Sequence, residues 1–180
     1  LKELGRLEEA KESCRQAITL KPDLAEAHYN LGNTLKEQGR LDEAEASYTQ
    51  AITLKPDYAE AHYNLGNTLK ELGRLDEAET NYRKAIALKP DYAEAHNNLG
   101  NTLKELGRFE EAEASYTQVL VLNPDSAVAH GNLGMVLQEL GRLDEAEVSY
   151  RHAIVLKSDN ACVYINVRIF LQNPVCLEEA

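Results

Sequence analysis

The sequence contains no tryptophan, two phenylalanines, one methionine and three cysteines among its 180 residues. Three cysteines are too few, and odd in number, for a disulfide framework, which favours a reducing compartment. We therefore expect a cytoplasmic location. We interpret Cys14, Cys162 and Cys176 as small apolar residues rather than as reactive groups.

Positive charge is also scarce, because 19 lysines and arginines stand against 30 aspartates and glutamates, a net charge of -11. Phosphate contacts need clustered Lys and Arg, so we expect no nucleic-acid partner. Long apolar runs are missing as well, since a bilayer span needs roughly 18 apolar residues. The most apolar stretch, "VYINVRIFL", is much shorter and contains Arg168. We expect no membrane partner either.

What the chain has in abundance is internal repetition. Units begin at Ala25, Ala59, Ala93, Ala127 and Ala161, a constant step of 34 residues. Such a period indicates a repeat architecture in which each unit packs only on its neighbours. Both ends of the chain cut a unit, so we expect an excerpt of a longer array. We predict a single solenoid over residues 1–180: a partial unit 1–24, full units 25–58, 59–92, 93–126 and 127–160, and a degenerate, truncated unit 161–180.

Each unit predicts two helices. Ala27, Leu31 and Leu35 lie on one face at helical spacing, and Gly39 then suits the left-handed residue that ends a helix. The apolar face of the second helix consists of Leu41, Ala44, Tyr48, Ala51 and Ile52. Pro56 ends the second helix.

Two further patterns concern the helix ends. The helix-ending glycine recurs as Gly5, Gly39, Gly73, Gly107 and Gly141. Asp57, with Glu60 three residues later, indicates a capping box at the start of the next first helix.

These residues match a known repeat pattern, W-x2-L-G-x2-Y, then A-x3-F, then P. Here the pattern is His28-x2-Leu31-Gly32-x2-Leu35, then Ala44-x3-Tyr48, then Pro56. The chain resembles the tetratricopeptide-repeat family over essentially its whole length. The resemblance implies an all-α, right-handed superhelix of antiparallel helix pairs, with the first helices on the concave side. Small residues at Gly32 and Ala44 let the paired helices approach closely.

No catalytic or metal constellation is visible, so we expect neither an enzyme nor a cofactor. His28, His62, His96 and His130 recur once per unit. Packed helices lie about 8–10 Å apart, too far for these four to converge on an ion with bonds of about 2.0–2.1 Å. We interpret them as packed aromatics in the place of the family's tryptophan. His152 is interpreted as isolated, and the acids that open each second helix as solvated charges that favour the helix dipole.

The first helices carry a second stripe, which we interpret as not used for packing. Its members in the first full unit are Glu26, Tyr29, Asn30, Asn33, Lys36 and Glu37. Stacked units align them into rows: Asn30, Asn64, Asn98, Asn132 and Asn166; Asn33, Asn67 and Asn101, followed by Met135; Tyr29 and Tyr63, followed by Asn97 and Gly131; and Lys36, Lys70 and Lys104. We predict that the asparagine, tyrosine and lysine rows line a peptide groove.

Asparagine is a poor residue for an exposed helix interior. Its amide has both donor and acceptor, which suits the main chain of an extended peptide. The row resembles one in the repeat region of the O-linked N-acetylglucosamine transferases, which implies that it holds a partner's backbone. The alternative is that Asn30 and its copies bond to the neighbouring repeat or to water.

Three functions follow from these observations. The first is a non-catalytic module that binds an extended protein or peptide segment. The second is a self-associating scaffold, a homo-oligomer through exposed solenoid ends. The third is the substrate-recruiting arm of a larger, glycosyltransferase-like enzyme. The Lys/Arg clamp of some family members is replaced by Glu26, Glu60 and Glu94, so neutral or basic ligands are favoured over acidic tails.

Overall fold

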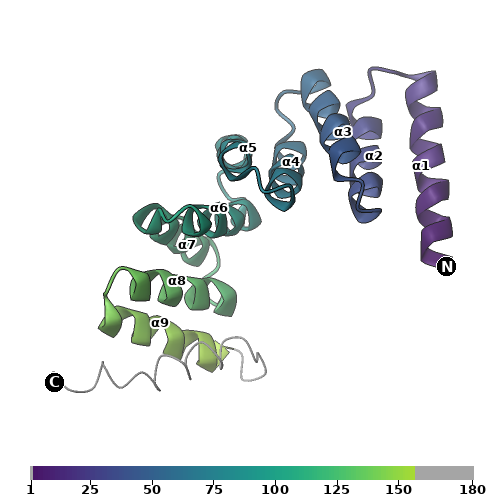
Figure 1. The fold of residues 1–180 in the computed structure, drawn as a ribbon. Coiled ribbons are helices and arrows are strands. Elements are labelled where there is room, and N and C mark those ends of the chain that lie inside the picture. Colours follow the sequence, from purple (N-terminus) through teal and green to yellow (C-terminus); the bar gives the residue numbers. More distant parts are fainter. Residues whose placement is uncertain (1, 157–180) are drawn as a thin grey trace. The chain divides into compact units, whose positions relative to one another are not determined.

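The computed structural model describes residues 2–156, with residues 2–5 described by their backbone alone. This part of the chain is all α, without strands (Figure 1). Its helices are α1 (Lys2–Leu20), α2 (Ala25–Glu37), α3 (Leu41–Leu54), α4 (Ala59–Glu71), α5 (Leu75–Leu88), α6 (Ala93–Glu105), α7 (Phe109–Leu122), α8 (Ala127–Glu139) and α9 (Leu143–Leu156). The unit predicted at 161–180, with Asn166, Cys162 and Cys176, lies outside the described residues, as does the stretch with Arg168.

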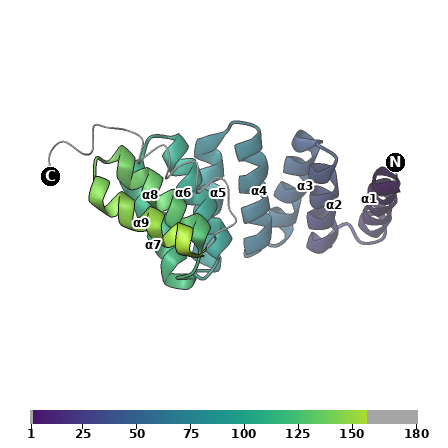
Figure 2. The ribbon, with the colours of Figure 1, turned by 90° about the horizontal axis from the view of Figure 1, so that it is seen from below.

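Two compact units divide between Ala95 and His96. In the first unit, α2 packs on α3 and α4 on α5, while α1 packs on α2 and α3 on α4 (Figures 1 and 2). In the second unit, α8 packs on both α7 and α9. Within each unit, helices therefore pack on their neighbours in sequence, which is the arrangement of an all-α solenoid.

The contact between paired helices is centred on glycine and tyrosine. Tyr48 and Ala44 of α3 are fully buried, with 0% exposure. A Cβ atom added to Gly32 of α2 would lie 2.7 Å from the ring of Tyr48. The same contact recurs between Gly66, Gly100 and Gly134 and their tyrosines Tyr82, Tyr116 and Tyr150. The prediction that Gly32 permits a close helix crossing is confirmed.

Glycine also ends the first helices. Gly39 has φ of +73°, its N–H donates to the Lys36 carbonyl at 2.9 Å, and the Arg40 N–H donates to the Leu35 carbonyl at 2.9 Å. The predicted helix end at Gly5 is wrong, because α1 continues through it. Each added helical residue forms a hydrogen bond, and a glycine inside a helix costs only about 1 kcal/mol.

The predicted capping box is also wrong. The residue that precedes α4 is Tyr58, and no side chain caps the helix there. Asp57 lies one position too early, and its backbone carbonyl accepts from the Ala59 N–H at 3.1 Å. At the equivalent of Tyr58, α8 has Ser126, whose hydroxyl accepts from the Ala129 N–H at 3.3 Å.

None of the helices within residues 2–156 is both long enough and apolar enough to cross a membrane.

Candidate peptide-binding face

In the first unit, the predicted site residues form one hydrogen-bonded network across three helices. The Tyr48 hydroxyl of α3 donates to Asn33 Oδ1 of α2 at 2.8 Å. Asn64 of α4 donates through Nδ2 to the same Asn33 Oδ1 at 3.0 Å and to the Tyr29 hydroxyl at 3.0 Å. The asparagine row therefore joins neighbouring repeats, as the alternative interpretation of the row expects.

The two asparagines of this network are left with opposite free groups. A side-chain amide has two N–H donors and an oxygen with two acceptor positions. Asn64 uses both donors, so only its Oδ1 remains. Asn33 uses both acceptor positions, while its two Nδ2 donors have no partner among residues 2–156. In this pair of repeats, the free donors and the free acceptor thus belong to two different rows. Within each compact unit, we call the surface formed by the predicted asparagine, tyrosine and lysine rows the first-helix face.

The second unit repeats this network with one substitution. Asn132 Nδ2 of α8 lies 3.4 Å from Asn101 Oδ1 and 3.2 Å from Asn97 Oδ1, and Asn97 takes the place of Tyr29. The Tyr116 hydroxyl donates to Asn101 Oδ1 at 2.7 Å. Asn97 also donates through Nδ2 to Asn98 Oδ1 at 3.3 Å. The shorter asparagine keeps the connection between repeats, but the bonds from Asn132 are longer than those from Asn64.

The network changes where the asparagine row ends. Met135 stands in the fourth copy at the position of Asn33. The hydroxyl of Tyr150 instead donates to Oε1 of Gln138, which occupies the lysine row, at 3.1 Å. Burial raises the pKa of Tyr150 to about 12.

Asn30 and Asn67 are the remaining described members of the two asparagine rows. Asn30 is exposed, and its side chain makes no hydrogen bond to residues 2–156. Helix α1 contains neither a tyrosine nor an asparagine that could bond to Asn30. Asn67 Oδ1 accepts from the Tyr82 hydroxyl at 2.8 Å, as Asn33 does from Tyr48.

The tyrosine row takes part in packing, contrary to the prediction that the stripe does not. The ring centroid of Tyr29 lies 4.9 Å from that of Tyr58 and 6.0 Å from that of Tyr48. Tyr63 makes the matching contact with Tyr92 at 4.8 Å. The aromatic rings bridge the two helices of a unit and the loop that follows, a contact that helical periodicity alone does not predict.

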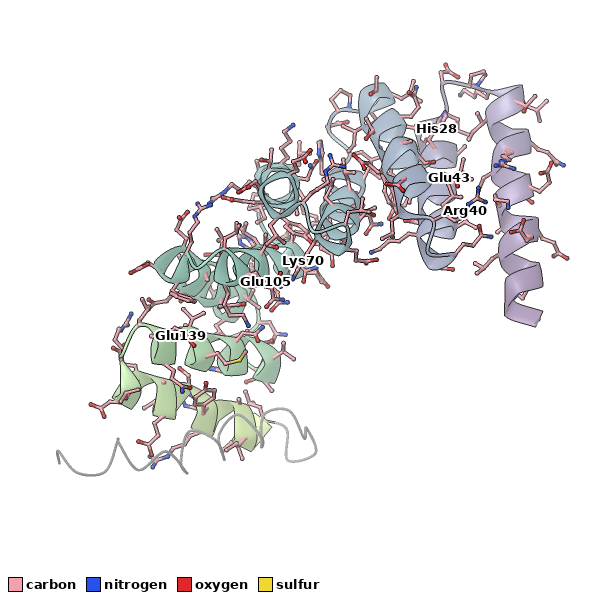
Figure 3. The ribbon with its side chains drawn as sticks, viewed as in Figure 1. His28, Arg40, Glu43, Lys70, Glu105 and Glu139 are labelled. Atoms are coloured by element: carbon pink, nitrogen blue, oxygen red, sulfur yellow. The ribbon has the colours of Figure 1, made fainter. Side chains whose placement is uncertain are left out.

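Lys36 of the lysine row, and Lys55 just after α3, each lie close to an acid. Lys36 Nζ lies 3.0 Å from Glu71 Oε1 of the next repeat. Lys55 lies 3.7 Å from Glu26 Oε1 and 4.6 Å from the centre of the Tyr58 ring. Figure 3 labels Lys70, the copy of Lys36 in α4. The other two predicted lysines, Lys70 and Lys104, are half-buried.

The second helices carry an arginine row that the sequence analysis missed. Arg40 donates to both carboxylate oxygens of Glu43 at 2.6 Å (Figure 3). Arg74 makes the same pair with Glu77 and also reaches back to Glu45 of the preceding repeat at 2.7 Å. The hydrogen bond from Arg74 lowers the pKa of Glu77. Glu43 and Glu77 are exposed in the first turns, as interpreted from sequence. Their ion pairs were not predicted, although an arginine follows each helix-ending glycine.

His28, His62 and His130 each contact the loop that joins their repeat to the preceding one. Nε2 of His28 lies 3.0 Å from the Pro22 carbonyl oxygen. His130 repeats this contact with Pro124 at 3.0 Å, and His62 with Pro56 at 3.3 Å. The packed-aromatic interpretation did not predict this hydrogen bond.

His152 is not isolated, contrary to its interpretation from sequence, because its ring centroid lies 5.1 Å from that of His130. Clusters of three or more His, Cys, Asp or Glu side chains that could hold a metal ion do not occur within residues 2–156.

Family models match most of the chain. The model described as "TPR repeat" matches residues 1–39, 32–73 and 66–107, and models described as "Tetratricopeptide repeat" match residues 93–126 and 115–148. The chain belongs to the tetratricopeptide-repeat family, and the predicted all-α solenoid of that type is confirmed. No curated protein matches the chain.

Solved structures with the same fold are numerous. MamA is 24% identical with a TM-score of 0.82, covering 86% of this chain and 91% of MamA. YrrB, described as a TPR protein with an unusual peptide-binding site, is 23% identical with a TM-score of 0.81. The match covers 94% of this chain and 87% of the YrrB chain. A thermophilic TPR protein from Thermus thermophilus is 25% identical with a TM-score of 0.67. The match covers 95% of this chain and 93% of that protein's chain.

Proposed function

We propose that this chain is a non-catalytic protein-interaction module that binds an extended peptide segment across the first-helix face. The observation behind the proposal is the pair of free Nδ2 donors on Asn33 beside the free Oδ1 acceptor of Asn64. An extended main chain offers one N–H and one C=O per residue, so it can meet both rows without regard to its side chains.

Preorganisation supports this function. The amides of Asn33 and Asn64 are fixed by hydrogen bonds to Tyr48 and Tyr29, so a ligand does not have to order them. Each neutral hydrogen bond contributes about 0.5–1.5 kcal/mol net. Repetition of the rows within each compact unit then sums contacts that are individually weak.

Electrostatics favour a ligand without strong negative charge. Lys36 is paired with Glu71, and Lys55 with Glu26, while the chain as a whole carries a net charge of -11. Neutral or basic extended segments therefore suit this face better than acidic tails. That YrrB shares this fold and is described as having a peptide-binding site supports the class of function.

The substitution Asn33→Asp tests this proposal selectively. Aspartate keeps an acceptor oxygen for Tyr48 and Asn64 but removes both outward donors. A random library of 12-residue peptides would be selected on the wild-type chain, and the affinity of the selected peptides measured by fluorescence anisotropy. We expect a loss of about tenfold or more, the equivalent of about 1.4 kcal/mol.

Gln50→Glu supplies the matched control, because it adds the same charge at an exposed position of α3, away from the first-helix face. We expect its peptide affinity to equal that of the wild type. Equal binding by wild type and Asn33→Asp would refute the proposal. Asn64→Ala is a poorer test, because it also breaks two hydrogen bonds between repeats.

Self-association is a second candidate function. Val121, Val148 and Val155 of α7 and α9 are 68%, 52% and 82% exposed. Exposed apolar side chains favour a partner where they form a contiguous patch. Light scattering that gives the mass of one chain over a wide concentration range would rule this out.

The third candidate is that the same peptide binding recruits substrates to a larger, glycosyltransferase-like enzyme. It rests on the resemblance of the asparagine rows to those of the O-linked N-acetylglucosamine transferases. If so, an enzyme that contains this chain would glycosylate the selected peptides more slowly when the chain carries Asn33→Asp.

A further inference from the structure

We propose that His130 and His152 form a two-histidine site for a divalent transition-metal ion on the surface of α8 and α9. The rings belong to different helices of one pair and lie 5.1 Å apart, centroid to centroid. Neutral imidazole is a ligand suited to zinc, copper and nickel. Two imidazoles with water in the remaining positions would make an open site.

The hydrogen bond of His130 places its lone pair on Nδ1. Its Nε2 lies 3.0 Å from the carbonyl oxygen of Pro124, and a carbonyl only accepts, so Nε2 carries the hydrogen. In the neutral ring Nδ1 is then the unprotonated nitrogen, which is the form that binds a metal. Histidine ligands commonly donate their other N–H to a backbone carbonyl in this way, which fixes tautomer and ring orientation.

The spacing of the rings agrees with shared coordination. Two imidazoles bound to one ion through bonds of about 2.0–2.1 Å have ring centres roughly 4.5–5 Å apart. The observed 5.1 Å needs only a small adjustment. His152 is exposed and can make this adjustment, while His130 is half-buried and anchored by Pro124.

Within residues 25–156, only the repeat formed by α8 and α9 combines these features. The copies of His152 in the sequence are Gln50, Lys84 and Gln118. His28 has the same bond from Nε2 to a proline carbonyl, but Gln50 stands in place of the second imidazole. The site is thus a feature of one repeat on a scaffold that the others share.

Zinc binding to the intact chain tests the proposal. Isothermal titration with ZnCl₂ would be compared between the wild type and His152→Gln, the residue that two other repeats hold at this position. We expect the variant to lose one bound Zn²⁺ per chain or to bind it at least about tenfold more weakly. MgCl₂ should bind neither protein at this site, because Mg²⁺ prefers oxygen ligands. Identical zinc stoichiometry and affinity in both proteins would overturn the proposal.

Transfer of the site to another repeat provides an independent test. Gln50→His places an imidazole at the equivalent position beside His28, whose Nε2 is held by Pro22. We expect one additional Zn²⁺ per chain, and a Cu²⁺ electron paramagnetic resonance spectrum with nitrogen couplings from two imidazoles. No additional ion in Gln50→His, combined with a wild-type site insensitive to His152→Gln, contradicts the inference.

Discussion

Gly32 and Tyr48 show how tightly single residues are constrained in this repeat. A Cβ atom at Gly32 would lie 2.7 Å from the tyrosine ring, closer than ordinary contact allows. Overpacking costs about 1–3 kcal/mol, whereas replacing glycine by alanine in a helix gains about 1 kcal/mol. For Gly32→Ala we expect a net loss of about 1 kcal/mol in the free energy of unfolding, measured with urea.

The exposed Asn30 on the same helix is the control, since Asn30→Ala gains helix propensity without a clash. It should leave stability unchanged or slightly higher. A gain in stability for Gly32→Ala equal to that of Asn30→Ala would mean that the close contact has no energetic importance.

Because several tyrosines are buried, the free energy of unfolding depends on pH in the alkaline range. Burial raises the pKa of Tyr48, Tyr116 and Tyr150, for Tyr150 from 10.0 to about 12. The folded state thus favours the neutral hydroxyl. The contribution of this neutral hydroxyl to the free energy of unfolding is complete below pH 10. It is lost as the pH rises through the pKa that the hydroxyl has in the folded state. Unfolding free energies measured from pH 8 to 12 should be level at first and fall above pH 10.

Absorbance at 295 nm would report the ionisation of the same tyrosines. We expect the buried ones to ionise together with the loss of helix measured by circular dichroism. Ionisation of every tyrosine near pH 10 with the helices intact would contradict the assigned burial.

Between elements, the arginine row links second helices of neighbouring repeats. Arg74 contacts both Glu77 and Glu45, but all three side chains are at least partly exposed. Exposed ion pairs contribute little and are screened by salt. Arg74→Gln should therefore lower the thermal midpoint slightly at low salt and leave it unchanged in 1 M NaCl. A large decrease that persists in 1 M NaCl would indicate a structural role beyond electrostatics.

The helices were largely predictable from sequence, and their ends less so. Ala27 and Leu35 lie on a strict helical period and are buried as predicted. The helix end at Gly39 could be predicted from sequence, because its backbone is in the left-handed region, which favours glycine. Gly5 has the same sequence context, but α1 continues through it. The capping box at Asp57 was wrong because α4 begins one residue later than the box requires, after Tyr58, which does not cap it.

Across repeats, the asparagine network predicts unequal stability effects in the two units. Asn64→Ala removes two hydrogen bonds of 3.0 Å, whereas Asn132→Ala removes contacts of 3.2 and 3.4 Å. At about 0.5–1.5 kcal/mol per bond, we expect a loss of roughly 1–3 kcal/mol for Asn64→Ala and a smaller loss for Asn132→Ala. Chemical denaturation monitored by circular dichroism would measure both, and equal or reversed losses would contradict the comparison.

The rows of the proposed site could be identified from sequence, but the hydrogen bonds that their side chains make could not. A constant step of 34 identified the rows of Asn33 and Asn64. Which atom of each amide is free depends on Tyr48 and Tyr29, whose hydroxyls reach the row from positions with their own packing roles. His152 was missed for a similar reason, since its partner His130 is 22 residues away and on another helix.

The division of donors and acceptors between Asn33 and Asn64 is the central claim at the scale of the whole molecule. Side-chain amide proton exchange, followed by NMR, measures it directly. The account predicts that the Nδ2 protons of Asn33 exchange rapidly in the free protein and become protected with a selected peptide, while those of Asn64 are protected in both states. Rapid exchange at Asn64 in the free protein, or no protection of Asn33 with the peptide, would contradict it.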